Sequence, residues 1–199
     1  MAIVDELRSP EQWKPHVQVN EGHYSAAYDS YEHWIRYYWA IHNVLDKRLA
    51  SVLEIGVGCG VVTSYLRKQG VQLTTFDLDP ALQPDVLGSV TNMPFAEGQF
   101  DAVICSEVLE HMPWEHSVAG LKEIHRVTKR YAFVTVPQFV LSFAVLLRAP
   151  ILQLRELRFH VPYPKAAPTS GEHYWELGRR GYPKRKFDRA ERDAGFEIL

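Results

Sequence analysis

The chain has 199 residues, a length that suits one α/β domain with a modest extension. Hydrophobic residues make up 46% of it and charged residues 23%, as in an ordinary globular protein with a substantial core. The formal net charge of -2 lacks the strong basic excess of a dedicated nucleic-acid binder. Nucleic acid is therefore not an expected partner, although a local basic patch stays open.

The N-terminus is charged and lacks the apolar centre of a signal peptide. The longest apolar run, residues 139–147, is too short to cross a bilayer, so we expect no membrane span. Cys59 and Cys105 lie in apolar stretches that predict burial, and no metal-ligand spacing surrounds them. These features predict a reduced, cytoplasmic protein.

Residues 1–50 form an extension that is rich in aromatic side chains. Between residues 30 and 49, apolar residues recur at the spacing of a helix, so we predict one long helix there. The residues that carry this spacing are Trp34, Tyr38, Ile41, Leu45 and Leu49.

Residues 51–137 alternate between apolar strands and helices. Such alternation implies crossover connections, and the continuous apolarity of the strands implies that both sheet faces are covered. The fold class predicted is α/β, with a Rossmann-like, mostly parallel sheet and helices on both faces. We predict strands at 51–55, 71–76, 85–87, 100–105 and 131–136, and helices at 61–69 and 115–129.

Residues 138–183 interrupt the alternation, and this stretch is too long for an ordinary connection. We predict a helical insertion that covers the strand ends as a lid. Residues 184–199 then return to the core, with a last helix over 184–194, Gly195 as its stop and the start of a strand at 196–199.

A glycine-rich loop joins the first predicted strand to its helix. Gly56, Gly58 and Gly60 allow a tight turn and let a ligand approach the backbone without a side chain intervening. Asp77 ends the next strand, where a carboxylate can accept hydrogen bonds from both hydroxyls of a ribose. The alternatives are a plain tight turn and a helix cap, for which Asp79 is better placed because Pro80 follows it.

Two classes of nucleoside-containing cofactor suit this geometry. The dinucleotide fingerprint needs glycine or alanine at the position of Val61, which disfavours a nicotinamide oxidoreductase. An acid followed by glycines at every second position, Glu54 to Gly60, instead resembles the first motif of class I methyltransferases. Further segments resemble the type 11 group of that family over roughly residues 51–137: 88–95, 98–101 and 105–112.

The resemblance implies an S-adenosylmethionine-dependent methyltransferase and a set of residues that bind the cofactor. Glu54 would help to hold the cationic amino end of the cofactor, and Asp77 the ribose. Many relatives have an acid at the position of Ser89, so this uncharged contact to the adenine is a weaker expectation. The cofactor-binding residues implied are Glu54, Gly56, Gly58, Gly60, Asp77, Leu78, Ser89, Val90, Ser106 and Glu107.

Catalytic candidates follow the strand predicted at 100–105, where the methyl group should lie. His111 is the best candidate for a general base, and Glu107 is the second catalytic candidate. The alternative is that Glu110 and His111 only cap or orient the following loop. Ligand spacing gives no support for a metal, so none is expected.

The methyl acceptor is not readable from the sequence, because this scaffold serves many acceptors. Residues 171–178 form either an acceptor pocket or a loop pinned by its aromatics, and the basic residues at 179–186 either meet an anionic acceptor or face solvent. Residues 139–154, with the N-terminal aromatics, would form a lid over a small apolar or aromatic acceptor such as a quinone precursor or lipid.

Two functions therefore stay open, an active methyltransferase and a cofactor-binding subunit that acts with a partner and has no catalysis of its own. The oligomeric state is not predicted. The family usually ends in an antiparallel hairpin, of which only the first strand, 196–199, is expected here. Either the sequence is a piece of a longer chain or the final strand is absent.

Overall fold

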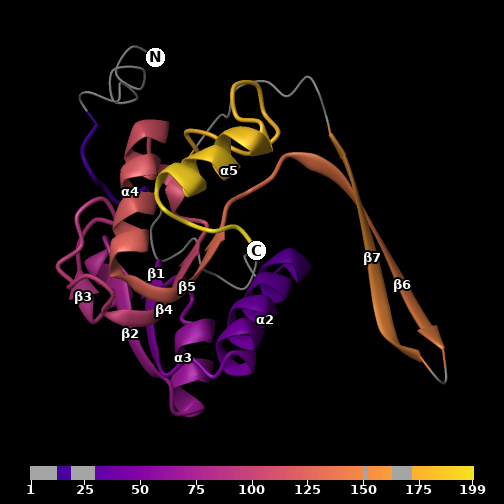
Figure 1. The fold of residues 1–199 in the computed structure, drawn as a ribbon, viewed down its shortest axis with the longest axis horizontal. Helices are drawn as coiled ribbons and strands as arrows, with labels where there is room; N and C mark the ends of the chain where they lie inside the picture. The colour runs from indigo at the N-terminus through magenta and orange to yellow at the C-terminus, as the bar shows by residue number, and fades with distance from the viewer. Residues whose placement is uncertain (1–12, 19–29, 150–151, 163–171) are drawn as a thin grey trace.

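A computed structural model describes residues 13–18, 30–149, 152–162 and 172–199 of the chain. Its centre is a five-stranded sheet in the order β3-β2-β1-β4-β5, and every neighbouring pair in it is parallel (Figure 1). The strands are β1 Ser51–Ile55, β2 Gln72–Asp77, β3 Val86–Leu87, β4 Phe100–Ser106 and β5 Thr128–Thr135. The parallel α/β sheet predicted from the alternation is confirmed.

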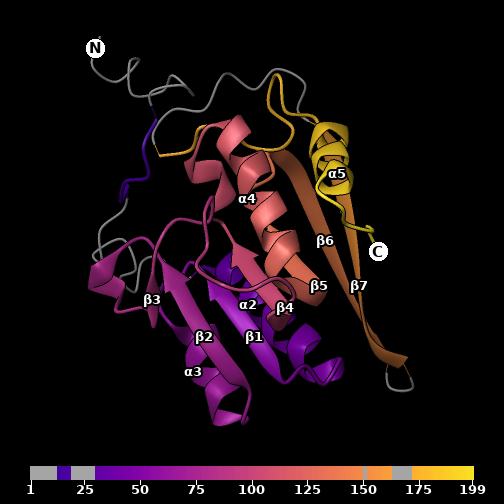
Figure 2. The same ribbon diagram turned by 60° about the vertical axis from the view of Figure 1, so that its left-hand side comes forward.

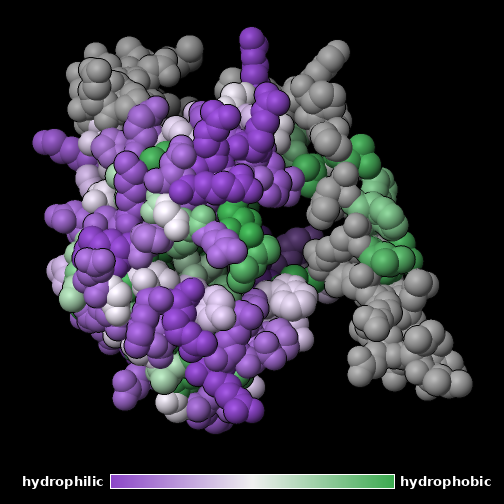
Figure 3. All heavy atoms as spheres, viewed as in Figure 1, coloured by the Kyte–Doolittle hydropathy of each residue, from purple (hydrophilic) through white to green (hydrophobic). Residues whose placement is uncertain are grey.

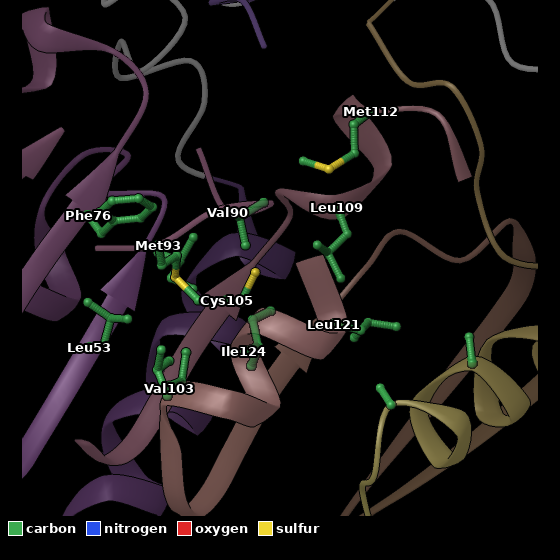
Figure 4. Packing of buried hydrophobic residues seen from close by; sticks show 14 of the residues in the cluster. Leu53, Phe76, Val90, Met93, Val103, Cys105, Leu109, Met112, Leu121 and Ile124 are labelled. Carbon is green, nitrogen blue, oxygen red and sulfur yellow. The ribbon is translucent and has the colours of Figure 1, made fainter. Parts of the chain in front are cut away.

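Helices cover both faces of this sheet (Figure 2). On one face, α2 and α3 pack on alternate side chains of the strands, such as Val52 and Ile104. On the other face, α4 and α5 pack on a larger cluster that includes Leu53 and Val103 (Figure 4). The helices are α2 Tyr31–Asp46, α3 Val61–Lys68, α4 Trp114–Val127 and α5 Lys184–Asp193, with short 3-10 turns η3 Pro80–Leu82 and η4 Leu109–His111.

Helix α2 begins at the Ser30 cap, whose side chain accepts a hydrogen bond from the backbone N–H of His33. The helix itself was predicted, but its apolar residues are not a buried stripe. Trp34 is 51% exposed and Tyr38 57% exposed, whereas the buried residues are Ala40 and Val44. The large aromatics of α2 thus lie mostly outside the core.

The helical insertion predicted for residues 138–183 is wrong. The described part contains an antiparallel hairpin, β6 Val140–Ala149 and β7 Leu152–Pro162, in which Phe143 faces Phe159. This hairpin extends away from the body of the molecule rather than over the strand ends (Figure 1). Nearly continuous apolar runs suit a helix or a strand equally well, and cross-strand pairing between 140–149 and 152–162 decides for strands.

Two smaller predictions also fail. Residues 196–199 form no strand, and Phe196 instead packs its ring edge-on against His125 of α4. Cys59 is exposed in the glycine loop, whereas Cys105 is buried as expected. Among the helices that the structure describes, none is long and apolar enough to cross a membrane.

Candidate cofactor and acceptor site

A cavity lies at the carboxyl ends of β1, β2 and β4, beside the point where the strand order reverses. In open parallel sheets this crevice is where ligands bind. All the residues predicted to bind the cofactor line the cavity, together with His111. They are Glu54, Gly56, Gly58, Gly60, Asp77, Leu78, Ser89, Val90, Ser106 and Glu107. Their shared location agrees with the sequence analysis, while their individual roles stay predictions.

The glycine loop needs its glycines for two different reasons. Gly56 has a φ of 83°, and a Cβ atom there would lie 2.5 Å from Cγ2 of Val108. Gly60 also has a positive φ, 73°, but a Cβ there would meet no heavy atom within 4 Å. Gly56 is thus required by packing between the loop and the end of β4, and Gly60 by its backbone conformation.

Asp77 is held by the backbone on both of its carboxylate oxygens. Val57 N–H donates to Oδ2 at 2.8 Å, and Asp79 N–H donates to Oδ1 at 2.9 Å. Each oxygen keeps a second lone pair, so the carboxylate can still accept two hydroxyl hydrogens. The residue that caps the following turn is Asp79 and not Asp77. The Asp79 side chain accepts a hydrogen bond from Ala81 N–H at 2.8 Å at the start of η3.

Glu54 lies on the α3 side of β1, where it is only 5% exposed. The hydroxyl of Thr63 donates a hydrogen bond to its Oε2. Burial raises the pKa of Glu54 to about 7, because the ionised form loses its hydration, even though the Thr63 hydrogen bond acts in the opposite direction. A cationic group placed beside this carboxyl would therefore remove its proton near neutral pH.

The segment after β3 supplies the far end of the cavity. Val90 is 4% exposed and turns its side chain into the core beside Leu109, where a Cβ on Gly120 would lie 3.4 Å from it (Figure 4). Ser89 Oγ lies 2.9 Å from Thr91 Oγ1, so its hydroxyl already has one partner. Neither Ser89 nor Val90 brings a charged group to the cavity, and their contacts to the adenine stay predictions.

Glu107 stands directly after β4 in an unusual conformation. Its φ of 55° lies in the left-handed region, which costs a non-glycine residue of the order of 1 kcal/mol. Its carboxylate lies 3.8 Å from the guanidinium of Arg36 on α2, and both side chains are partly exposed. Such strain is common at ligand sites, and Glu107 is one of the residues that line the cavity.

The N-terminal extension contributes a wall that the motifs did not predict. Residues 13–18 and α2 bring both apolar and polar side chains to the cavity. The residues of this wall are Trp13, Pro15, His16, Val17, Gln18, His33, Arg36, Tyr37 and Ala40. The abundance of aromatics before residue 50 was the available signal, and it led us to expect a cover over the site.

No hairpin residue that the structure describes lines the cavity, so the lid predicted over 139–154 is wrong in its position.

A further group of polar side chains, which includes His111 and His173, lies where η4 contacts the segment after residue 171. Tyr174 N–H donates to the carbonyl of Glu110 at 2.8 Å, which brings His173 beside His111 with their ring centroids 4.9 Å apart. Trp175 is fully buried and its indole N–H donates to Ser117 Oγ at 3.0 Å. The loop is therefore pinned by its aromatics, one of the two alternatives left open.

Glu110 is the most deeply buried acid of this group, with 0% exposure. Burial raises its pKa well above the ordinary value, and the nearby carboxylate of Glu107 raises it further. The pKa of Glu176 shifts in the opposite direction. Although burial opposes it, hydrogen bonds from Arg179 and His173 lower its pKa.

The basic residues at 179–186 do not line the cavity. Arg179 donates to Glu176 at 2.5 Å, Lys184 to Asp188 at 2.6 Å, and the ammonium of Lys186 lies 4.4 Å from the ring centroid of Trp114. These contacts favour the surface interpretation of the basic run.

The fold and the cavity together define a Rossmann-like α/β domain with its ligand site at the carboxyl edge of the sheet. Comparison with known families agrees with this class. Residues 53–136 match the family described as "Methyltransferase domain", the type 11 group. The core of the chain is therefore similar to that family over residues 53–136, as the order of the sequence motifs predicted.

Two curated relatives show the same similarity over the core. A demethylmenaquinone methyltransferase of Beutenbergia cavernae is 34% identical over 98 residues, which are 44% of this chain and 40% of that protein. A ubiquinone biosynthesis O-methyltransferase of Xanthomonas oryzae pv. oryzae is 36% identical over 84 residues, or 35% of each chain. The chain thus spans less than half the length of these relatives.

Among solved structures, the sugar N-methyltransferase KedS8 of Streptoalloteichus aligns with a TM-score of 0.55 at 11% identity. The alignment covers 92% of this chain and 87% of that one. At such low identity the likeness concerns the fold alone.

Proposed function

We propose that the chain is an S-adenosylmethionine-dependent methyltransferase acting on a small apolar or aromatic acceptor. The observation that carries the proposal is the convergence of the glycine loop, Glu54 and Asp77 on one cavity at the carboxyl edge of the sheet. The match of residues 53–136 to the methyltransferase domain supports it independently.

The residues present fit this cofactor. Asp77 is fixed by two backbone N–H groups and keeps acceptor capacity for a ribose, and Gly60 leaves open space beside the backbone. Glu54 is a buried carboxyl without a charged partner in hydrogen-bond contact among the described residues, as expected opposite a cationic amino group. The cofactor supplies a methyl group on a sulfonium, which is already strongly electrophilic.

The protein's own task is to align the acceptor and exclude water. Trp13 and Met112 are buried apolar side chains in the wall of the cavity. The two curated relatives are named for quinone biosynthesis, which favours an aromatic acceptor of that chemical type here. Glu107 and His111 are the titratable groups that could take a proton from an acceptor hydroxyl at this end of the cavity.

A methyl-transfer assay with radiolabelled S-adenosylmethionine against a panel of hydroxylated quinone precursors, phenols and amines tests the proposal. Transfer to phenols or quinone precursors, abolished in Glu107→Ala, is the expected result. Cofactor binding without transfer to any acceptor would instead support a binding subunit that acts with a partner. Absence of cofactor binding by the folded chain would refute the proposal.

A further inference from the structure

Glu110, His111 and His173 form a cluster beside the cavity, which His111 also lines. One possible ligand atom from each residue lies within 4.8 Å of the other two. Two of the residues are adjacent on η4, whereas His173 comes from the end of the insertion. The Tyr174 to Glu110 backbone hydrogen bond joins the two segments and holds them in register.

Glu110 is the unusual member of the cluster. Its side chain is 0% exposed, and neither carboxylate oxygen has a hydrogen-bond partner within the described parts of the chain. Leaving a buried carboxyl without a partner costs free energy, so native proteins rarely retain one without a ligand to satisfy it. No lysine or arginine that the structure describes forms an ion pair with it.

Both histidine rings are oriented through their Nδ1 atoms. His111 Nδ1 lies 3.1 Å from Oε1 of Gln18, and His173 Nδ1 lies 2.8 Å from Oε1 of Glu176. When Nδ1–H donates to an oxygen, the neutral ring presents an unprotonated Nε2. Arg179 completes the arrangement by donating to the second oxygen of Glu176 at 2.5 Å.

We propose that Glu110, His111 and His173 bind a divalent transition metal ion of the Zn²⁺ type at the acceptor end of the cavity. Two imidazoles and one carboxylate form a ligand set that binds such ions and leaves at least one position open. Imidazole nitrogen disfavours Mg²⁺ and Ca²⁺, which prefer oxygen ligands. Gln18 and Glu176 are the outer partners that orient the rings.

The distances between the possible ligand atoms are compatible with such a site. Bonds of about 2.0–2.1 Å in tetrahedral geometry place ligand atoms roughly 3.4 Å apart. Atoms that lie within 4.8 Å of one another therefore need to approach by at most about 1.4 Å, which small side-chain rotations can provide. No metal-ligand spacing was recognisable along the chain, because His173 is far in sequence from Glu110 and His111.

The existence of the metal site does not depend on the proposed function, but its role in methyl transfer does. His111 lines the cavity, so an open coordination position would face the acceptor and could bind its oxygen. Metal coordination lowers the pKa of a bound hydroxyl, which favours an oxygen acceptor over an amine. His111 would then serve as a ligand, and Glu107 would remain as the proton acceptor.

Calorimetric titration of the EDTA-treated, dialysed chain with ZnCl₂ tests the site directly, with MgCl₂ as the comparison ion. We expect one equivalent of Zn²⁺ to bind and Mg²⁺ at the same concentration to give no heat. Glu110→Gln, His111→Ala and His173→Ala should each abolish stoichiometric binding. Glu176→Gln, which leaves all three ligands, should weaken binding by about 10- to 100-fold.

His42→Ala is the matched control, because His42 is an exposed histidine on α2 outside the cluster. It should bind Zn²⁺ like the unaltered chain. Circular dichroism and S-adenosylhomocysteine binding, both in EDTA, show that each variant is folded.

No Zn²⁺ binding by the unaltered chain, or undiminished binding in all three ligand variants, overturns the metal site. Such a result beside intact S-adenosylhomocysteine binding leaves the proposed function standing. Zn²⁺ binding without S-adenosylhomocysteine binding supports the metal site and refutes the proposed function.

Discussion

The sheet core and the β6–β7 hairpin are both rich in apolar residues, yet the structure uses them in opposite ways. Leu53 and Val103 on neighbouring strands are fully buried between the sheet and its helices. On the hairpin, the described side chains beyond Val140 are about half exposed, and apolar residues gather on its surface (Figure 3). These side chains are Phe143, Val145, Leu157, Phe159 and Val161, with exposed fractions of 43–55%.

The difference teaches that apolarity alone does not define a core. The sheet strands are covered because crossover helices bring their own apolar faces to each side. The hairpin has only its partner strand, and a two-stranded unit is marginally stable in water. The insertion joins the body at its other end, where Trp175 packs among Trp114, Tyr182 and Phe187.

The largest expected effect follows from that anchor. Trp175→Ala removes a fully buried indole and its hydrogen bond to Ser117, so we expect the free energy of unfolding to fall by about 3–5 kcal/mol. Urea denaturation monitored by circular dichroism measures it. Trp34→Ala on the exposed side of α2 is the control and should change stability by less than about 0.5 kcal/mol. Equal effects in the two variants would contradict the assignment of Trp175 to the core.

The next effect concerns the cavity that the core supports. Asp77→Asn replaces the carboxylate that faces the ribose in the proposed complex, and charge-assisted hydrogen bonds are worth about 1.5–3 kcal/mol. We therefore expect the Kd for S-adenosylhomocysteine to rise by about 10- to 100-fold. Asp188→Asn, which only loses an exposed pair with Lys184, should bind normally. An unchanged Kd in the Asp77 variant would remove Asp77 from the binding residues.

A smaller effect follows from the pKa of about 7 at Glu54. A cofactor ammonium favours the ionised carboxylate, so binding below pH 7 must release the proton of Glu54. The affinity for S-adenosylhomocysteine should then rise by up to about tenfold per pH unit as pH increases towards 7, and level off above it. In Glu54→Gln this rise should disappear. Calorimetry between pH 5.5 and 8 measures both, and a rise that persists in the variant argues against Glu54 as its source.

The smallest effect on stability is expected in the hairpin. Phe143→Ser with Phe159→Ser removes an exposed cross-strand pair, so the free energy of unfolding of the body should change by less than about 0.5 kcal/mol. Self-association at high concentration, measured by light scattering, should decrease, because exposed apolar strands favour aggregation. A loss of stability comparable with that of Trp175→Ala would show that the hairpin is part of the core.

The core could be predicted because its apolar patterns and its glycine positions point to the same elements. The strand Ser51–Ile55 was predicted with its observed bounds, and Gly70, in a left-handed conformation, directly follows the helix predicted at 61–69. The glycine loop and Asp77 follow strands directly, so topology alone brings them to one edge of the sheet.

The hairpin and the polar cluster could not be predicted in the same way. Apolar residues occupy both alternating positions of β6, including Ala144 and Leu146, so no period distinguished a strand from a helix. His173 was noticed in its own segment, but only folding brings it to His111. Arg36 was missed as a cavity residue because its partner, Glu107, lies on another element.

The central claim is that the cavity between the glycine loop and Asp77 holds the adenosyl cofactor. Isothermal titration calorimetry of the folded chain with S-adenosylhomocysteine tests it most directly. The account predicts binding of one equivalent, weakened in Asp77→Asn but not in Asp188→Asn. Absence of binding heat over a range of temperatures, in protein shown to be folded by circular dichroism, would contradict it.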